Sequence, residues 1–236
     1  MTAIFKRELG SYFNSISGYI FIAVIYFFSG MFFFQGTIMQ NKADLNMVFE
    51  ILFFFVIFLI PILTMRLLSE EKRMKTDQAL LTAPIGPWSI VLGKYFSALA
   101  IYTMGISVTL IYSIIIAFYA TPNWVEIIGN FIGLFITGAA LIAIGLFLSS
   151  LTESQVISAI TSYVASFLIL ITDGIAQGIF AGKDLAYEIV SYLSFYKHYK
   201  SFTTGLLNLA DIVFFLSVCG LFLFLTTRTL ERKKWN

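Results

Sequence analysis

Residues 47–68 read MVFEILFFFVIFLIPILTMRLL and are followed at once by the charged segment SEEKRMKTD at residues 69–77. The apolar segment exceeds the roughly 20 residues that a helix needs to cross a bilayer's hydrocarbon core. Only a helix satisfies its own backbone hydrogen bonds in lipid, and the segment lacks the alternating pattern of a barrel strand. We therefore predict a transmembrane helix here, after which the charged segment emerges into water.

Five further apolar runs of this kind occur along the 236-residue chain. The composition is 59% hydrophobic and only 12% charged, about half the charged fraction of a typical water-soluble domain. Six spans leave short loops and no room for a soluble catalytic domain of ordinary size. We expect an all-α polytopic membrane protein with a single domain over residues 1–236. The expected spans are residues 19–37, 47–68, 95–119, 127–148, 156–172 and 212–227.

The distribution of Lys and Arg predicts the orientation, because these residues are retained on the cytoplasmic side of a membrane. With the N-terminus in the cytoplasm, all but four of the 15 Lys and Arg residues fall on that side. Six crossings then return the C-terminus to the cytoplasm, so both termini are expected there. The net charge of +2 is too balanced to indicate nucleic acid as a partner. The four residues on the outer side are Lys42, Lys183, Lys197 and Lys200.

The segment before the first span, residues 2–16, has the pattern of an amphipathic helix. We expect it to lie flat on the inner leaflet, with its basic side chains toward lipid headgroups. The alternative is a partly buried start to the first span. The residues that carry the pattern are Phe5, Leu9, Tyr12 and Phe13 on the apolar arc, and Lys6 and Arg7 on the basic arc.

The segment between the second and third spans, residues 69–93, is the longest and most charged on the cytoplasmic side. A charge run precedes the apolar pair Leu80 and Leu81, and Pro84 and Pro87 are then expected to stop any helix. A short helix across the membrane surface fits this order. A solvated connector is the alternative, although a connector has no need of the apolar pair. The charged and polar residues of the run are Glu70, Glu71, Lys72, Arg73, Lys75 and Thr76.

Two further features bear on helix packing. Residues 173–211 are too long for an ordinary connection and too apolar to float free, so we expect a short external helical hairpin before the last span. Within the fourth span, Gly129 and Gly133 form a GxxxG pattern, which lets helices approach closely. This pattern fits either an interface between subunits or packing within one subunit.

The sequence lacks the residue patterns of catalysis and cofactor binding. It has no GxxxxGK[ST] phosphate-binding loop, and its single histidine, His198, excludes an HExxH zinc site. Its single cysteine, Cys219, excludes an internal disulfide. The span interiors also lack charged residues away from their ends, so the energy for any transport is expected from another protein. We therefore predict no catalytic, metal or cofactor site in this chain.

Four motifs, taken in order along the chain, resemble those of the permease subunit of ABC-2 family ABC transporters. Residues 5–13 resemble that family's KREL..YF surface helix, and residues 70–94 resemble its EEKR, LLT.PI and VLGK loop. Residues 145–155 resemble its turn between the fourth and fifth spans. Residues 198–215 resemble the approach to the last span in the gliding-motility-type branch. Lys75 stands where the family often has Gly.

The resemblance implies that two such permeases, copies or homologues, pair and that two separate ABC ATPase subunits dock beneath them. Residues 70–82 are then the coupling helix, in which the charges orient the ATPase and Leu80 and Leu81 supply the buried contact. The resemblance further implies that ATP and magnesium bind to the ATPase, that the protein lies in the inner (plasma) membrane, and that the direction of transport is export. Membrane lipid and an extracytoplasmic accessory protein are further partners that this arrangement allows.

Two hypotheses from other classes stay open at this point. An ATPase-driven membrane scaffold or mechanical subunit, which moves a protein partner instead of a solute, fits the same motifs. A membrane-embedded lipid enzyme is disfavoured by the missing catalytic residues. Substrate-stimulated ATP turnover distinguishes a permease from a scaffold, and co-purification with an ATPase distinguishes both from an enzyme.

Overall fold

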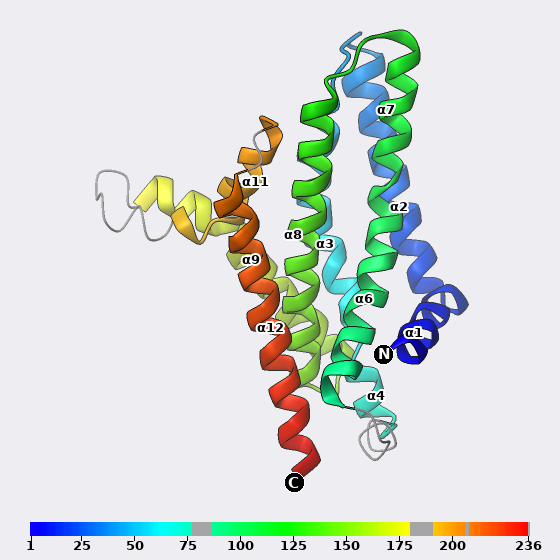
Figure 1. Cartoon of the computed structure of the whole chain (residues 1–236), viewed down its shortest axis with the longest axis vertical. Helices are drawn as coiled ribbons and strands as arrows, with labels where there is room; N and C mark the ends of the chain where they lie inside the picture. Colours follow the sequence, from blue (N-terminus) through cyan, green and yellow to red (C-terminus); the bar gives the residue numbers. More distant parts are fainter. Residues whose placement is uncertain (77–85, 180–190, 206–207, 236) are drawn as a thin grey trace.

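The computed structural model describes residues 1–76, 86–179, 191–205 and 208–235, and the regular elements in these ranges are all helical. The helices form an elongated bundle, with α1 turned across its long axis (Figure 1). Six helical segments of the described chain are long and apolar enough to cross a membrane, which confirms the prediction of an all-α protein with six spans. The elements are α1 (Thr2–Asn14), α2 (Ile16–Phe33), the π-helical η1 (Phe34–Ile38), α3 (Asn46–Thr64), α4 (Ser69–Arg73), α6 (Pro87–Ile106), α7 (Val108–Tyr119), α8 (Trp124–Leu151), α9 (Gln155–Ile179), α11 (Phe195–Thr203) and α12 (Leu209–Trp235).

The helices differ from the predicted spans mainly at their ends. The predicted span 47–68 is helical only to Thr64, where α3 ends and a turn leads into α4. The next helix begins at Pro87 instead of residue 95, so the expected loop to residue 93 is too long. Pro87 was expected to stop a helix and instead starts one. It occupies the first turn, where its missing N–H has no helical partner to lose and its fixed φ favours the helix.

Helix α8 lies at the centre of the bundle and packs against α3, α6, α9, α11 and α12. Its middle, residues 137–146, is buried on every side, as expected of a helix that is apolar all round. Small residues let neighbouring side chains approach it closely. A Cβ at Gly138 would lie 2.2 Å from the Tyr102 ring, and a Cβ at Gly145 would lie 2.2 Å from the Thr64 hydroxyl. Side chains of α6 and α3 are therefore packed directly against the backbone of α8.

The N-terminal helix is separated from the first span by a break in the chain direction. Helix α1 ends at Asn14, Ser15 is extended, and α2 begins at Ile16. Helix α1 packs along α6, and a Cβ at Gly93 of α6 would lie 2.9 Å from the Ile4 side chain. The glycine therefore permits the close crossing of these two helices. Whether α1 also touches lipid stays a prediction.

In the half of the bundle away from α4, α11 packs against α8, α9 and α12 (Figure 1). Helix α11 belongs to the predicted external hairpin, whose residues 180–190 lie outside the described ranges. Phe202 of α11 covers both glycines of the GxxxG pattern. A Cβ at Gly133 would lie 2.7 Å from Phe202 Cβ, and a Cβ at Gly129 would lie 2.7 Å from the Phe202 carbonyl oxygen. This face of α8 is therefore filled by packing within one chain.

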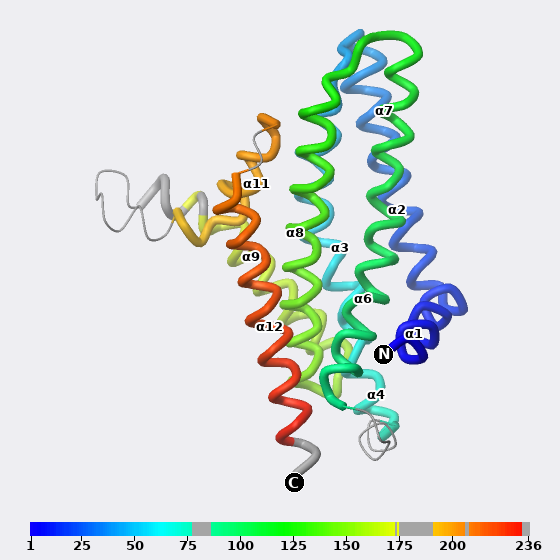
Figure 2. Tube along the Cα trace, in the orientation of Figure 1, coloured from blue at the N-terminus to red at the C-terminus, as the bar shows by residue number. Residues whose placement is uncertain are grey.

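The last helix returns the chain to the end of the bundle that carries α4. Helix α12 runs beside α8 over most of its length, as Figure 2 shows. The Thr229 hydroxyl of α12 lies 3.3 Å from the hydroxyl of Ser150, in the last turn of α8. One end of the bundle therefore brings together α4, the C-terminal end of α8 and the last turns of α12.

Candidate coupling site

Helix α4 occupies only Ser69–Arg73, and its first turn is capped by a side chain from another helix. The backbone N–H groups of Leu68 and Ser69 both donate to the Ser149 hydroxyl, each over 3.1 Å. The same hydroxyl donates to the carbonyl of Met65 over 3.3 Å. The first N–H groups of a helix have no intrahelical partner, so Ser149 near the end of α8 acts as an N-cap from a distant part of the chain. The start of α4 is thus bonded to α8.

Lys72 adds a second bond between α4 and α8. Its side chain is buried, and its Nζ donates to the backbone carbonyl of Ser150. That carbonyl lies in the last turn of α8, which ends at Leu151 and where the helix dipole is negative. Carbonyls in this turn have no intrahelical partner, so a cation stabilises them. The Lys72 side chain is therefore bonded to another helix of the same chain.

Glu71 belongs to a cluster of four charges from three helices. This four-charge cluster consists of Arg7 and Glu8 of α1, Glu71 of α4 and Lys94 of α6. Glu71 Oε1 lies 2.5 Å from Arg7 and 3.0 Å from Lys94, and Glu8 Oε1 lies 2.6 Å and 3.2 Å from the same two residues. Each cation therefore contacts both carboxylates. Lys94 is fully buried, so its charge depends on these two partners.

Two further contacts attach the same region to α1 and α2. Arg66, just before α4, pairs with Glu70 over 2.9 Å and donates to the Ser17 hydroxyl over 3.1 Å. The Tyr12 hydroxyl of α1 donates to the carbonyl of Leu63 over 2.9 Å. Burial raises the pKa of Tyr12, which keeps this hydroxyl protonated and able to donate. Helix α4 and the turn before it are thus bonded to α1, α2, α6 and α8.

The end of α4 is closed by a Schellman motif. The N–H of Thr76 donates to the carbonyl of Glu71 over 3.0 Å, and the N–H of Lys75 donates to the carbonyl of Lys72 over 3.1 Å. Lys75 has a φ of +55°, the left-handed conformation that this motif requires. Glycine adopts that conformation without the steric cost that a Cβ imposes. This geometry gives a physical reason for Gly at the equivalent position in proteins with the same loop motif.

A family model described as ABC-2 family transporter protein matches residues 5–235, almost the whole chain. The chain belongs to this family. A comparison with curated proteins finds no match. ABC-2 proteins are membrane transport components, and this ABC-2 chain is a multi-pass membrane protein with six helices of spanning length and composition.

The predicted ATPase-coupling residues of this ABC-2 protein divide into two groups. Some form ion pairs or hydrogen bonds with other residues of the same chain, so their charged groups have partners within the bundle. Others are exposed beyond the first turn of α4, where another protein can reach them. The residues with partners in the bundle are Glu70, Glu71 and Lys72. The exposed residues are Arg73, Lys75 and Thr76, and Leu80 and Leu81 lie outside the described residues.

The predicted surface helix of the ABC-2 protein, α1, has some residues that contact the rest of the chain and others that are exposed. The guanidinium of Arg7, expected to face lipid headgroups, contacts Glu8 and Glu71. Lys6 is exposed, and its contact with headgroups stays a prediction. Of the apolar residues on this helix, Tyr12 is buried, whereas Phe5, Leu9 and Phe13 are half-buried.

Sequence reasoning missed several members of the site, and four of them lie within the ABC-2 motifs. Glu8 lies in the KREL motif and Lys94 in the VLGK motif, while Ser149 and Ser150 lie in the last turn of α8, within the motif of residues 145–155. Their roles depend on partners far away in sequence, which a motif alone does not identify. Among the described residues, no three His, Cys, Asp or Glu side chains are grouped to hold a metal ion.

Proposed function

We propose that this chain is the transmembrane permease subunit of an ABC transporter. It pairs with a second permease, a copy of itself or a homologue, and with two separate ATPase subunits, and it exports a substrate across the plasma membrane. Both termini then lie in the cytoplasm, on the same side as α4. The observation that supports this proposal most is the bonding of α4 to α1, α6 and α8 in a chain of the ABC-2 family. The motif in residues 198–215 favours the gliding-motility-type branch.

The contacts of α4 give a route by which a docked ATPase moves the membrane-crossing helices. A displacement of α4 pulls on the end of α8 through Ser149 and Lys72, and on α1 and α6 through Glu71. Because α8 is packed at the centre of the bundle, its displacement changes the arrangement of the surrounding helices. ATP binding in the partner then favours one arrangement by making different contacts with each.

The exposed end of α4 carries the contacts for the ATPase. Arg73 and Lys75 present two positive charges to solvent, and the Met74 side chain between them is 62% exposed. An apolar side chain flanked by cations fits a groove that has an apolar floor and an acidic rim. Leu80 and Leu81 extend this contact in the proposal, in line with the loop motif.

Charge reversal at the exposed end tests the proposal. The Lys75→Glu variant is expected to lose most of the ATPase that co-purifies with the wild-type protein from detergent-solubilised membranes, because it opposes the acidic rim. The matched control is Lys42→Glu, which reverses an exposed lysine in the connection between η1 and α3. Equal recovery of the ATPase with both variants would contradict the docking role of this end of α4.

A further inference from the structure

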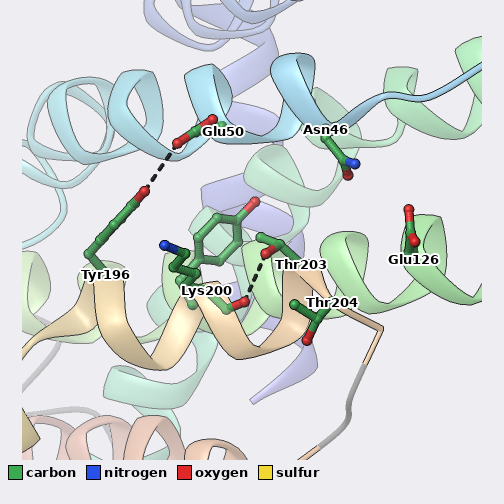
Figure 3. Close-up of a pocket in the computed structure, with 8 residues that line it drawn as sticks. Asn46, Glu50, Glu126, Tyr196, Lys200, Thr203 and Thr204 are labelled. Atoms are coloured by element: carbon green, nitrogen blue, oxygen red, sulfur yellow. Dashed lines mark hydrogen bonds between the residues drawn. The ribbon is translucent and has the colours of Figure 1, made fainter. Parts of the chain in front are cut away.

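The cavities of the bundle differ in the side chains that line them. The pocket between α3, α8 and α11 is polar, and Figure 3 shows Glu50, Lys200 and Glu126 around it. A groove between α1, α6 and α8 has a volume of about 660 Å³ and a surface that is almost entirely apolar. Its volume is within the range of sites that bind small molecules. Apolar atoms do not replace the hydrogen bonds that a polar solute makes with water, so this α6 groove suits a hydrocarbon chain.

Helix α6 supplies most of the lining of the α6 groove. Its lining residues recur at the three- and four-residue spacing of one helix face. The hydroxyls of Thr103 and Ser107 both donate to carbonyls of their own helix over 2.7 Å, so these donors are satisfied without a ligand. The small side chain of Ala100 lies about one turn from the larger side chains of Phe96 and Met104, which leaves space between them. The six residues are Phe96, Leu99, Ala100, Thr103, Met104 and Ser107.

The α6 groove spans about one leaflet of a bilayer. Helix α6 rises about 16 Å from Phe96 to Ser107, and one leaflet contributes half of a hydrocarbon core that is about 30 Å thick. Both residues lie in a helical segment with the length and composition of a membrane span, Pro87–Tyr119. The groove therefore matches an acyl chain of the leaflet on the α1 side, in length as well as in chemistry.

Helix α1 lies at one end of the α6 groove and places a cation beside it. A Cβ at Gly93 would lie 2.9 Å from the Ile4 side chain, so α1 crosses α6 three residues before Phe96. Phe5, the residue after Ile4, lines the groove. The Cα atom of Lys6 follows that of Phe5 by about 3.8 Å, and the Lys6 side chain is exposed. Among the residues that the structure describes, none of the ion pairs includes Lys6.

This charge favours a lipid over a protein as the occupant of the α6 groove. An apolar protein helix packed along the groove and over Phe5 would remove water from the neighbouring Lys6 ammonium and offer it no partner. A phospholipid instead carries a phosphate at the end of its acyl chains. The flexible stem of a lysine can lie on apolar groups while its ammonium reaches a phosphate at the membrane surface. Charge complementarity therefore favours a phospholipid.

We propose that the α6 groove binds one phospholipid, with an acyl chain over Ala100 and its phosphate at Lys6. The rings of Phe5 and Phe135 border the chain from α1 and α8. The bound lipid then contacts three helices at once, which distinguishes it from a lipid that touches a single helix. A headgroup with a net negative charge binds more tightly than an uncharged one, because Lys6 attracts it. The proposal concerns this chain alone and does not rest on its pairing with an ATPase.

Native mass spectrometry of the purified full-length protein tests the site, with dioleoylphosphatidylglycerol and uncharged dioleoylglycerol as the titrated probes. We expect the saturable addition of one phosphatidylglycerol to the folded wild-type protein. Lys6→Gln is expected to weaken the binding of phosphatidylglycerol about fivefold and to leave the weaker binding of dioleoylglycerol unchanged. Ala100→Phe places a ring where the chain lies, so it is expected to abolish the saturable binding of both probes. Circular dichroism checks that each variant keeps the helical content of the wild type.

Two control variants separate this site from lipid that coats the whole bundle. Ala117→Phe introduces the same side chain at an exposed position of α7, outside the α6 groove, and Lys200→Gln removes an exposed lysine of the pocket in Figure 3. Both controls are expected to bind phosphatidylglycerol as the wild type does. The proposal is overturned if Ala100→Phe binds it as well as Ala117→Phe, or if Lys6→Gln binds it as well as Lys200→Gln.

Two results with the wild-type protein would also overturn the proposal. One is the absence of any saturable phosphatidylglycerol addition to the folded chain. The other is a dimer of this chain that Ala100→Phe dissociates while the amount of bound lipid stays the same, because a second copy would then occupy the α6 groove.

Discussion

The Glu71→Gln variant tests the four-charge cluster that joins α4 to α1 and α6. It removes the charge that lies 3.0 Å from the buried ammonium of Lys94 and leaves Glu8, at 3.2 Å, as the remaining carboxylate partner. At an effective dielectric constant of about 20, the attraction lost between Glu71 and Lys94 is about 5.5 kcal/mol before desolvation is subtracted. Glu71 regains hydration in the unfolded state, and Glu8 still pairs with Lys94 in the variant. The net loss in the free energy of unfolding is therefore smaller than this attraction. We expect the free energy of unfolding to fall by about 2–4 kcal/mol.

A double-mutant cycle measures this coupling directly. The variants are Glu71→Gln, Lys94→Met and the two combined, unfolded reversibly by sodium dodecyl sulfate in mixed micelles and followed by circular dichroism. The double variant removes both charges together, so its loss of stability is expected to be smaller than the sum of the single losses by about 2 kcal/mol. Arg7 contributes little to this figure, because its side chain is 52% exposed.

The control for this cycle is Glu231→Gln, which removes an ion pair with Arg228 over 3.0 Å on the exposed face of α12. An exposed pair of this kind is expected to contribute less than about 1 kcal/mol. The account of the cluster is refuted if Glu71→Gln loses no more stability than Glu231→Gln. It is equally refuted if the losses at Glu71 and Lys94 are additive, because the two groups would then not interact.

Three further predictions concern α4 and the loop motif that follows it. Lys75→Gly is expected to raise the free energy of unfolding by roughly 0.5–1 kcal/mol, because its φ of +55° strains a residue that has a Cβ; a loss of stability in the same micelle assay would argue against this. Ser149→Ala is expected to lower the free energy of unfolding by about 1–2 kcal/mol in that assay, since two backbone N–H groups lose their acceptor. An unchanged free energy of unfolding would show that the cap does not stabilise α4. The double variant Leu80→Asp and Leu81→Asp should insert into the membrane normally and lose its co-purifying ATPase, whereas wild-type recovery of the ATPase would remove the coupling assignment from this pair.

The membrane-crossing helices could be predicted from the sequence because each is specified locally. A span of about 20 apolar residues must be helical in lipid whatever its neighbours are. The ends of the helices depend on finer effects. Pro87 illustrates this, since proline stops a helix in its interior and favours one at its first turn. The two cases differ only in where the helix begins relative to the proline. The pattern of apolar residues does not determine where the helix begins.

The contacts of the charged residues could not be predicted in the same way. The charge run after α3 suggests a solvated face, yet Lys72 and Glu71 point into the chain toward Ser150 and Lys94. These partners come from α8 and α6 and become neighbours only when the bundle packs. The same holds for Gly133, whose pattern indicates a close approach without saying that Phe202 makes it.

The most direct test of the account is a photo-crosslink from the exposed end of α4. A photoreactive amino acid replaces Met74, whose side chain is 62% exposed, and in a parallel sample it replaces Lys42 on the η1–α3 connection. After irradiation of intact cells, the account predicts that position 74 forms a covalent adduct with an ABC ATPase subunit and that position 42 does not. An adduct with the ATPase at both positions, or at neither, would contradict the claim that this chain is driven by a separate ATPase through α4.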